Sequence, residues 1–102
     1  MSKNVIQFIS YKLVEGASVA DFLLASEKCN NEVLSKHPGF ISWKMLTEGD
    51  MWVDLVTWET MEDAINAQNN ESFMHNPVAL QFFSFINFES LKSQLFSVEK
   101  SY

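Results

Sequence analysis

The sequence predicts an α+β fold in which a four-stranded antiparallel sheet carries helices on one face. Segments rich in β-branched and aromatic residues, with apolar and polar positions in alternation, are typical of strands. Longer segments repeat their apolar residues at helical spacing. In chain order these segments read β-α-β-β-α-β.

The first strand and the first helix occupy the N-terminal third of the chain. We expect a strand over Asn4–Leu13, with Val5, Gln7, Ile9, Tyr11 and Leu13 on one face. Ser18 is a favourable helix N-cap, and Asp21 stands at the capping-box position. The helix is predicted to run to about Lys36, because Pro38 disfavours helix in the residue before it.

Residues 39–58 predict a β-hairpin folded on the turn Gly49-Asp50. A two-residue turn pairs Glu48 with Met51 and Met45 with Asp54. A carboxylate among tryptophans is costly unless it is paired or hydrated, so Asp54 is the leading candidate for function. One face of the hairpin then carries Ile41, Trp43, Met45 and Thr47 opposite Trp52, Asp54, Val56 and Trp58.

The remainder of the chain predicts two helical segments and a strand. Thr60 caps the first segment, and Asn76 caps the second, with Pro77 at its favoured first position. The last strand is expected over residues 91–98. The inner side of the first segment is predicted to carry Met61, Ala64, Ile65 and Gln68, and the second segment to carry Val78, Leu80, Phe82, Phe83 and Phe85. The element order predicts one ferredoxin-like domain over residues 1–102, with the helices on one face of the sheet.

The second face of the predicted sheet is also apolar. The helices can cover only one face, so this second face needs another cover. A second copy of the chain, packed face to face about a two-fold axis, supplies it, and we expect a homodimer. The residues on this face are Ile6, Phe8, Leu46, Val53 and Leu55.

The composition excludes several classes of function. The net charge of −6 over 102 residues argues against nucleic acid as a partner. No apolar run approaches the roughly 20 residues of a membrane span, and residues 1–4 lead directly into a strand-like segment, so neither a membrane span nor a signal peptide is expected. A single cysteine, Cys29, fits a reducing cytoplasm. His37 and His75 have no cysteine pair to join them, so no metal site is expected.

Three short motifs resemble the antibiotic biosynthesis monooxygenase superfamily. They are Pro38-Gly39-Phe40 before a strand, the strand end Val56-Thr57-Trp58-Glu59, and the helix opening Thr60-Met61-Glu62-Asp63-Ala64. Members of this superfamily are dimeric α+β barrels. The resemblance implies a cofactor-independent monooxygenase, although the superfamily also contains haem-degrading enzymes and small-molecule isomerases.

The resemblance carries over only part of the functional residues of these enzymes. Trp58 matches the pocket tryptophan of the polyketide-oxidising members, and Asp54 stands where they have asparagine. Met45 and Ala64 stand where they have tyrosines. The polyketide-oxidising pattern is therefore half present.

The haem-degrading pattern is absent at the matching positions. Ile9, Gln68 and Pro77 stand where that branch has an asparagine, a tryptophan and a histidine. His75 lies two residues short of the histidine position. Haem degradation is therefore disfavoured, and no cofactor is expected.

We predict a cavity for a small apolar or aromatic ligand between the sheet and the helices. A buried carboxylate gains a raised pKa and can act as a general base, giving an anion that reacts directly with oxygen. The predicted catalytic residues are Asp54, Tyr11 and His75, and the predicted substrate-binding residues are Gln7, Trp43, Met45, Trp52 and Trp58. Three alternatives stay open: an isomerase that uses the same abstraction, a non-catalytic dimeric ligand-binding or stress-related protein, and a purely structural Asp54 paired with Lys12 or Lys44.

Overall fold

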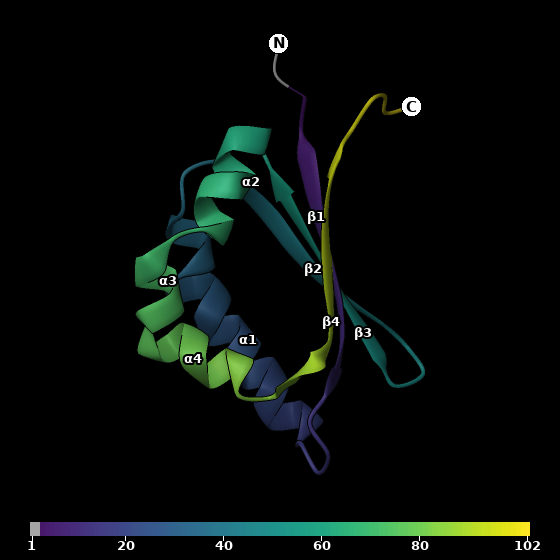
Figure 1. Ribbon diagram of the computed structural model, residues 1–102, viewed down its shortest axis with the longest axis vertical. Helices are drawn as coiled ribbons and strands as arrows, with labels where there is room; N and C mark the ends of the chain where they lie inside the picture. Colours follow the sequence, from purple (N-terminus) through teal and green to yellow (C-terminus); the bar gives the residue numbers. More distant parts are fainter. Residues whose placement is uncertain (1–2) are drawn as a thin grey trace.

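The computed structural model describes residues 3–102. Met1 and Ser2 lie outside the described residues; they belong to the N-terminal segment in which no signal peptide was predicted. Four antiparallel strands form one sheet in the order β2-β3-β1-β4. All helices lie on the same side of this sheet (Figure 1), which confirms the predicted α+β arrangement. The strands are β1 (Val5–Leu13), β2 (Phe40–Glu48), β3 (Met51–Trp58) and β4 (Ile86–Ser97).

The first helix is shorter than predicted. Helix α1 covers Val19–Glu32, and a 3-10 turn, η1, follows over Leu34–Lys36. Ser18 caps α1 by accepting a hydrogen bond from the N–H of Asp21, as the sequence predicts. The helix ends at Val33, whose backbone is not helical (φ −123°, ψ −67°) and whose β-branched side chain has low helix propensity.

The hairpin between β2 and β3 has the predicted register. Glu48 pairs with Met51 and Met45 with Asp54, and Gly49 adopts the positive φ of 60° that the turn requires. The pairing shifts at Ile41, which was predicted to face the helices. This bulge turns the Ile41 side chain outward.

The bulge brings Phe40 into the place predicted for Ile41. Phe40 pairs with Trp58 across the strands, and the two rings pack edge to face at 5.9 Å. The end of the hairpin that lies nearest the helices is therefore aromatic on both strands.

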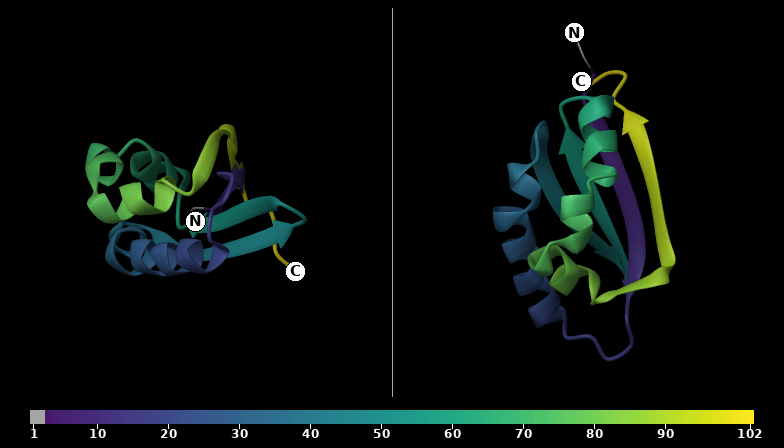
Figure 2. Two further views of the ribbon diagram at one scale, coloured as in Figure 1. Left: turned by 90° about the horizontal axis from the view of Figure 1, so that it is seen from below. Right: turned by 60° about the vertical axis from the view of Figure 1, so that its left-hand side comes forward.

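Three short helices connect β3 to β4: α2 (Met61–Gln68), α3 (Glu71–His75) and α4 (Pro77–Phe83). Asn76 caps α4 as predicted, whereas α3 lies between the two predicted helical segments, where no separate helix was predicted. In α2 the prediction for Ile65 was wrong: Ile65 is exposed and Ala67 lies on the inner side instead. Figure 2 shows α1 and the α2–α4 segment side by side over the sheet.

The last strand begins five residues earlier than predicted, at Ile86. Its first residues pair with the end of β1 across an irregularity between Ser10 and Lys12, where the Ser90 hydroxyl accepts a hydrogen bond from the N–H of Lys12. This irregularity interrupts the period-two alternation on which the sequence prediction depended. Phe85, predicted to be helical, lies between α4 and β4.

Candidate active site

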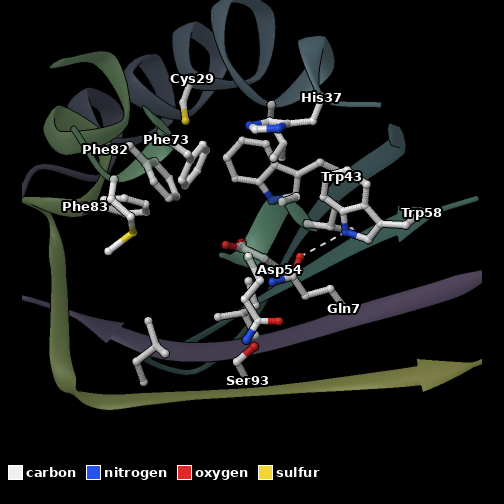
Figure 3. A pocket seen from close by; sticks show the side chains of 17 residues that line it. Gln7, Cys29, His37, Trp43, Asp54, Trp58, Phe73, Phe82, Phe83 and Ser93 are labelled. Carbon is white, nitrogen blue, oxygen red and sulfur yellow. Dashed lines mark hydrogen bonds between the residues drawn. The ribbon is translucent and has the colours of Figure 1, made fainter. Parts of the chain in front are cut away.

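A cavity of about 260 Å³ lies between the helices and the sheet (Figure 3). Its wall is predominantly aromatic and aliphatic, with a few polar groups. Among the described residues that line it there is no lysine and no arginine. The lining residues are Gln7, Ile9, Cys29, Leu34, His37, Trp43, Asp54, Val56, Trp58, Ala67, Gln68, Phe73, Met74, Phe82, Phe83, Leu91 and Ser93.

Among the described residues of the cavity wall, Asp54 supplies the only carboxylate, and it is 4% exposed. Its position follows from the sheet register, because it pairs with Met45 on β2 and Ile9 on β1 in the middle of the helix-facing side. Within residues 3–102 neither lysine considered as a partner forms a salt bridge with it; Lys12 instead pairs with Asp50 at 3.6 Å. Asp54 is thus a buried carboxylate without a cationic partner.

The environment of Asp54 changes its acidity. Burial raises the pKa of Asp54 to about 6, because the ionised form loses its hydration. The hydrogen bond from Tyr11 and the nearby indole N–H of Trp43 lower that pKa in part. The carboxylate is therefore ionised at neutral pH and close to the range in which it can take up and release a proton.

Tyr11 lies behind Asp54, away from the cavity. Its side chain is fully buried, and its hydroxyl donates to the Asp54 carboxylate, with Oη 2.9 Å and 3.0 Å from the two carboxylate oxygens. Burial, followed by the neighbouring charge of Asp54, raises the pKa of Tyr11 well above its usual value, so the phenol stays protonated. The sequence prediction placed Tyr11 against the ligand, but the structure places it as a support for the carboxylate.

Two indole groups reach the cavity from the hairpin. The Nε1 of Trp58 donates to the Oε1 of Gln7 at 3.1 Å, which fixes both side chains in the wall (Figure 3). The Nε1 of Trp43 is buried and has no hydrogen-bond partner within the described chain. Burying an N–H without a hydrogen-bond partner costs free energy. A ligand oxygen that accepts from Trp43 beside the carboxylate would remove this cost.

His37 lines the cavity although the sequence prediction assigned it to a turn. Its ring packs against Phe73 at 5.5 Å and Trp58 at 6.4 Å between ring centroids. Desolvation lowers the pKa of His37, so the imidazole is neutral at pH 7.

The position of His37 just before the second strand is the sequence feature that could have predicted this placement. In the structure, backbone hydrogen bonds from the N–H of Phe40 to the carbonyl of His37 and from the N–H of Glu59 to the carbonyl of Gly39 hold this segment against the end of β3. The motif His37-Pro38-Gly39 thus stands directly before the strand residue that pairs with Trp58, and this pairing brings His37 to the same end of the sheet.

Besides Tyr11, three predicted site residues lie outside the cavity wall. His75 is exposed at the end of α3 and does not line this cavity. Met45 is half-buried in the neighbouring core cluster. Trp52 packs edge to face on Phe22 at 5.1 Å, further along the hairpin. Gln7, Trp43, Asp54 and Trp58 are the predicted residues that the structure brings together.

Two features are absent from residues 3–102: a cluster of metal-binding side chains and a helix that could cross a membrane. Within this range, no group of three or more His, Cys, Asp or Glu side chains is arranged to hold a metal ion. None of the helices in this range combines the length and the apolar character that crossing a membrane requires.

Comparison with known proteins places the fold. No protein-family model and no curated protein sequence matches the chain. The fold is similar to that of SnoaB, a cofactor-independent oxygenase from Streptomyces nogalater, with a TM-score of 0.76 over 98% of this chain and 97% of that chain, at 16% identity. It is also similar to a protein of Bacillus cereus assigned as an antibiotic biosynthesis monooxygenase (TM-score 0.69, 17% identity, 99% and 98% coverage).

A heme-degrading protein from Mycobacterium tuberculosis shares the fold as well, with a TM-score of 0.63, 12% identity, and coverage of 100% of this chain and 98% of that chain. These likenesses confirm the predicted fold, that of antibiotic biosynthesis monooxygenase-like proteins. Because proteins with different activities share it, the chemistry has to be argued from the site.

Proposed function

We propose that this protein is a cofactor-independent monooxygenase of the antibiotic biosynthesis monooxygenase superfamily, acting on a small aromatic or enolisable molecule. The observation that carries the proposal is Asp54, a buried carboxylate with a pKa raised to about 6 in the wall of an apolar, aromatic cavity. A group of this kind is a general base matched to neutral pH. The structural likeness to the oxygenase SnoaB supports the same class of chemistry.

The proposed reaction begins with transfer of a substrate proton to Asp54. The electron pair of the broken C–H or O–H bond stays on the substrate as a delocalised anion. Dioxygen from solution takes one electron from this anion, and the two radicals combine into a peroxide bonded to carbon. The peroxide takes the proton back from Asp54. Its O–O bond then breaks, the second hydrogen of the same carbon leaves with the terminal OH as water, and the remaining oxygen becomes a carbonyl. The sum is RH₂ + O₂ → R=O + H₂O.

The surrounding residues assist the proton transfer. Tyr11 holds the carboxylate in one orientation through its hydrogen bond. The Nε1 of Trp43 is buried beside that carboxylate and makes no hydrogen bond within the described chain, so we expect it to donate to a substrate oxygen that enters between the two, which stabilises the anion. The predominantly aromatic wall can pack on the faces of a flat ring.

We also propose that two copies of the chain associate through the face of the sheet that the helices leave open. Leu46 and Phe96 on this face are 45% and 50% exposed, and Phe8, Val53 and Leu55 lie between them, half-buried. The register places these apolar side chains next to one another across all four strands, which gives a continuous surface that can pair with itself. The buried free thiol of Cys29 supports a cytoplasmic location.

Oxygen uptake tests the proposed activity. The protein is mixed with a panel of phenols and enolisable ketones with one or two rings, among them 1,4-dihydroxynaphthalene and 2-tetralone, in an oxygen electrode, with buffer alone as the baseline. We expect uptake above the baseline for at least one compound, with one oxygen molecule consumed per product. Isomerised product without oxygen uptake would favour an isomerase instead, and no turnover of any compound would favour a binding protein.

A further inference from the structure

The cavity that the proposed function treats as a substrate site carries an unbalanced charge. Its ionisable lining residues are Asp54, His37 and Cys29, and the described wall holds no lysine or arginine. Burial lowers the pKa of His37 and raises the pKa of Cys29 to about 11, so both are neutral at pH 7. Asp54 is thus the only charged group of the wall at neutral pH.

The indole N–H of Trp43 and the carboxylate of Asp54 offer a hydrogen-bond donor and a hydrogen-bond acceptor to the same ligand atom. Within residues 3–102 the Trp43 N–H makes no hydrogen bond, so it can donate to a ligand oxygen that lies beside Asp54. An ionised carboxylate has about four acceptor positions, and the single proton of Tyr11 occupies one of them. A hydroxyl oxygen, or the oxygen of an enol, is the group that can accept from Trp43 and donate to Asp54 at the same time.

An aromatic acid does not meet these requirements. Its carboxylate can accept from Trp43 but cannot donate to Asp54, and it places a second negative charge beside the first, against a predominantly apolar wall. Two like charges a few ångströms apart repel more strongly beside an apolar wall than in open water, and no lysine or arginine of the described wall relieves this repulsion.

From these observations we infer that the cavity selects an uncharged hydroxyaromatic molecule or enolisable ketone and excludes aromatic acids. The inference rests on the proposed function only in taking the cavity as the substrate site. A volume of about 260 Å³ lies below the roughly 300 Å³ at which pockets for drug-sized ligands begin, so the probes should have no more than two rings.

The chain contains its own reporter for this test. It has three tryptophans, and each gives one indole N–H signal in a ¹⁵N-correlated NMR spectrum. Trp43 and Trp58 line the cavity, whereas Trp52 lies outside it and serves as an internal control. Each signal is assigned from the corresponding Trp→Phe variant.

The labelled protein is titrated at pH 7.5 with 2-naphthol and with 2-naphthoate, which share one ring framework and differ in charge. We expect 2-naphthol to shift the Trp43 and Trp58 signals while Trp52 stays in place, and 2-naphthoate to bind at least tenfold more weakly. Equal or tighter binding of 2-naphthoate, or no binding of 2-naphthol, would overturn the inference.

Two variants test the cause of the selection. Asp54→Asn should reduce the difference between the two probes to less than threefold, because it removes the charge and keeps an acceptor for Tyr11. Gln68→Lys, at an exposed position of the cavity wall, should improve naphthoate binding at least fivefold relative to naphthol. An unchanged preference in both variants would show that the carboxylate does not set it.

These measurements need no turnover, so they separate this inference from the proposed activity. If the probes follow the predicted preference but no compound consumes oxygen, the activity is wrong and the charge selection stands. If an aromatic acid is turned over efficiently, the selection is wrong and the activity stands.

Discussion

Neighbouring residues of β3 lie in two different environments. Asp54, Val56 and Trp58 point towards the helices and are 4%, 3% and 0% exposed. Val53 and Leu55 point to the other side of the sheet, where the helices are absent, and are only half-buried. The first set surrounds a carboxylate with aromatic rings, and the second forms an apolar surface.

The comparison shows how alternation in one strand serves two purposes. Because side chains point to opposite faces with a period of two, one strand can place a base in a cavity and an apolar patch on an interface. A substitution on one face should therefore leave the property of the other face largely unchanged.

The largest expected effect is on turnover. Asp54→Asn removes the general base and should lower kcat/KM by about 100- to 10,000-fold, measured by oxygen uptake with whichever compound the wild type consumes. Asp50→Asn, at an exposed carboxylate in the hairpin turn, is the matched control and should change the rate less than twofold. Equal rates for wild type and Asp54→Asn would remove Asp54 from the chemistry.

The second expected effect is on association. Leu55→Lys places a charge in the middle of the open face and should raise the dissociation constant of the proposed dimer at least 100-fold, since an unpaired charge is costly to bury. Leu24→Lys on α1 makes the same change at a site that is 65% exposed, and should not alter association. Sedimentation velocity over a range of concentrations measures both, and a monomeric wild type would contradict the proposed interface.

A third prediction concerns stability against pH. Since folding raises the pKa of Asp54 from 3.8 to about 6, the folded protein holds this proton more tightly than the unfolded chain. The contribution of Asp54 to the free energy of unfolding is therefore greatest below pH 4 and falls by about 2–3 kcal/mol as pH rises to 6.

Urea unfolding of the wild type and of Asp54→Asn at several pH values measures the pH-dependent contribution of Asp54 to the free energy of unfolding. The variant should become relatively more stable from pH 4 to 7. A difference between the two proteins that stays constant with pH would show that the pKa of Asp54 is not raised by folding.

The smallest expected effect comes from the support behind the carboxylate. Tyr11→Phe removes a hydrogen bond that favours the ionised form, so the pKa of Asp54 should rise further. The rate should then fall roughly three- to tenfold at pH 6 and much less at pH 8. A pH–rate profile distinguishes this from a general loss of packing, which would lower the rate equally at all pH values; Tyr102→Phe, at an exposed position, is the control.

The sequence was sufficient for those parts of the molecule that depend on local patterns. The turn Gly49-Asp50 and the alternation of the hairpin determined the register, and the register placed Asp54, Trp43 and Trp58 on one face. Likewise, the helix caps Ser18, Thr60 and Asn76 were correct, because capping depends on residues a few positions apart.

The features that the sequence did not reveal depend on tertiary contacts. The bulge at Ile41 and the early start of β4 arise where strands from distant parts of the chain pair irregularly. His37 enters the site because the backbone hydrogen bonds after η1 fold its loop onto the end of β3. His75 lies outside the cavity wall because it ends α3, a helix that the sequence pattern did not predict, and its side chain is exposed there.

The central claim is that Asp54 removes a proton from a substrate held in the cavity, and deuterium exchange measures this step by itself. The protein is incubated with 2-tetralone in D₂O without oxygen, and loss of the α-proton signal is followed by ¹H NMR. We expect the wild type to exchange these protons at least tenfold faster than both Asp54→Asn and buffer, with Asp50→Asn matching the wild type. Exchange in Asp54→Asn at the wild-type rate would contradict the claim.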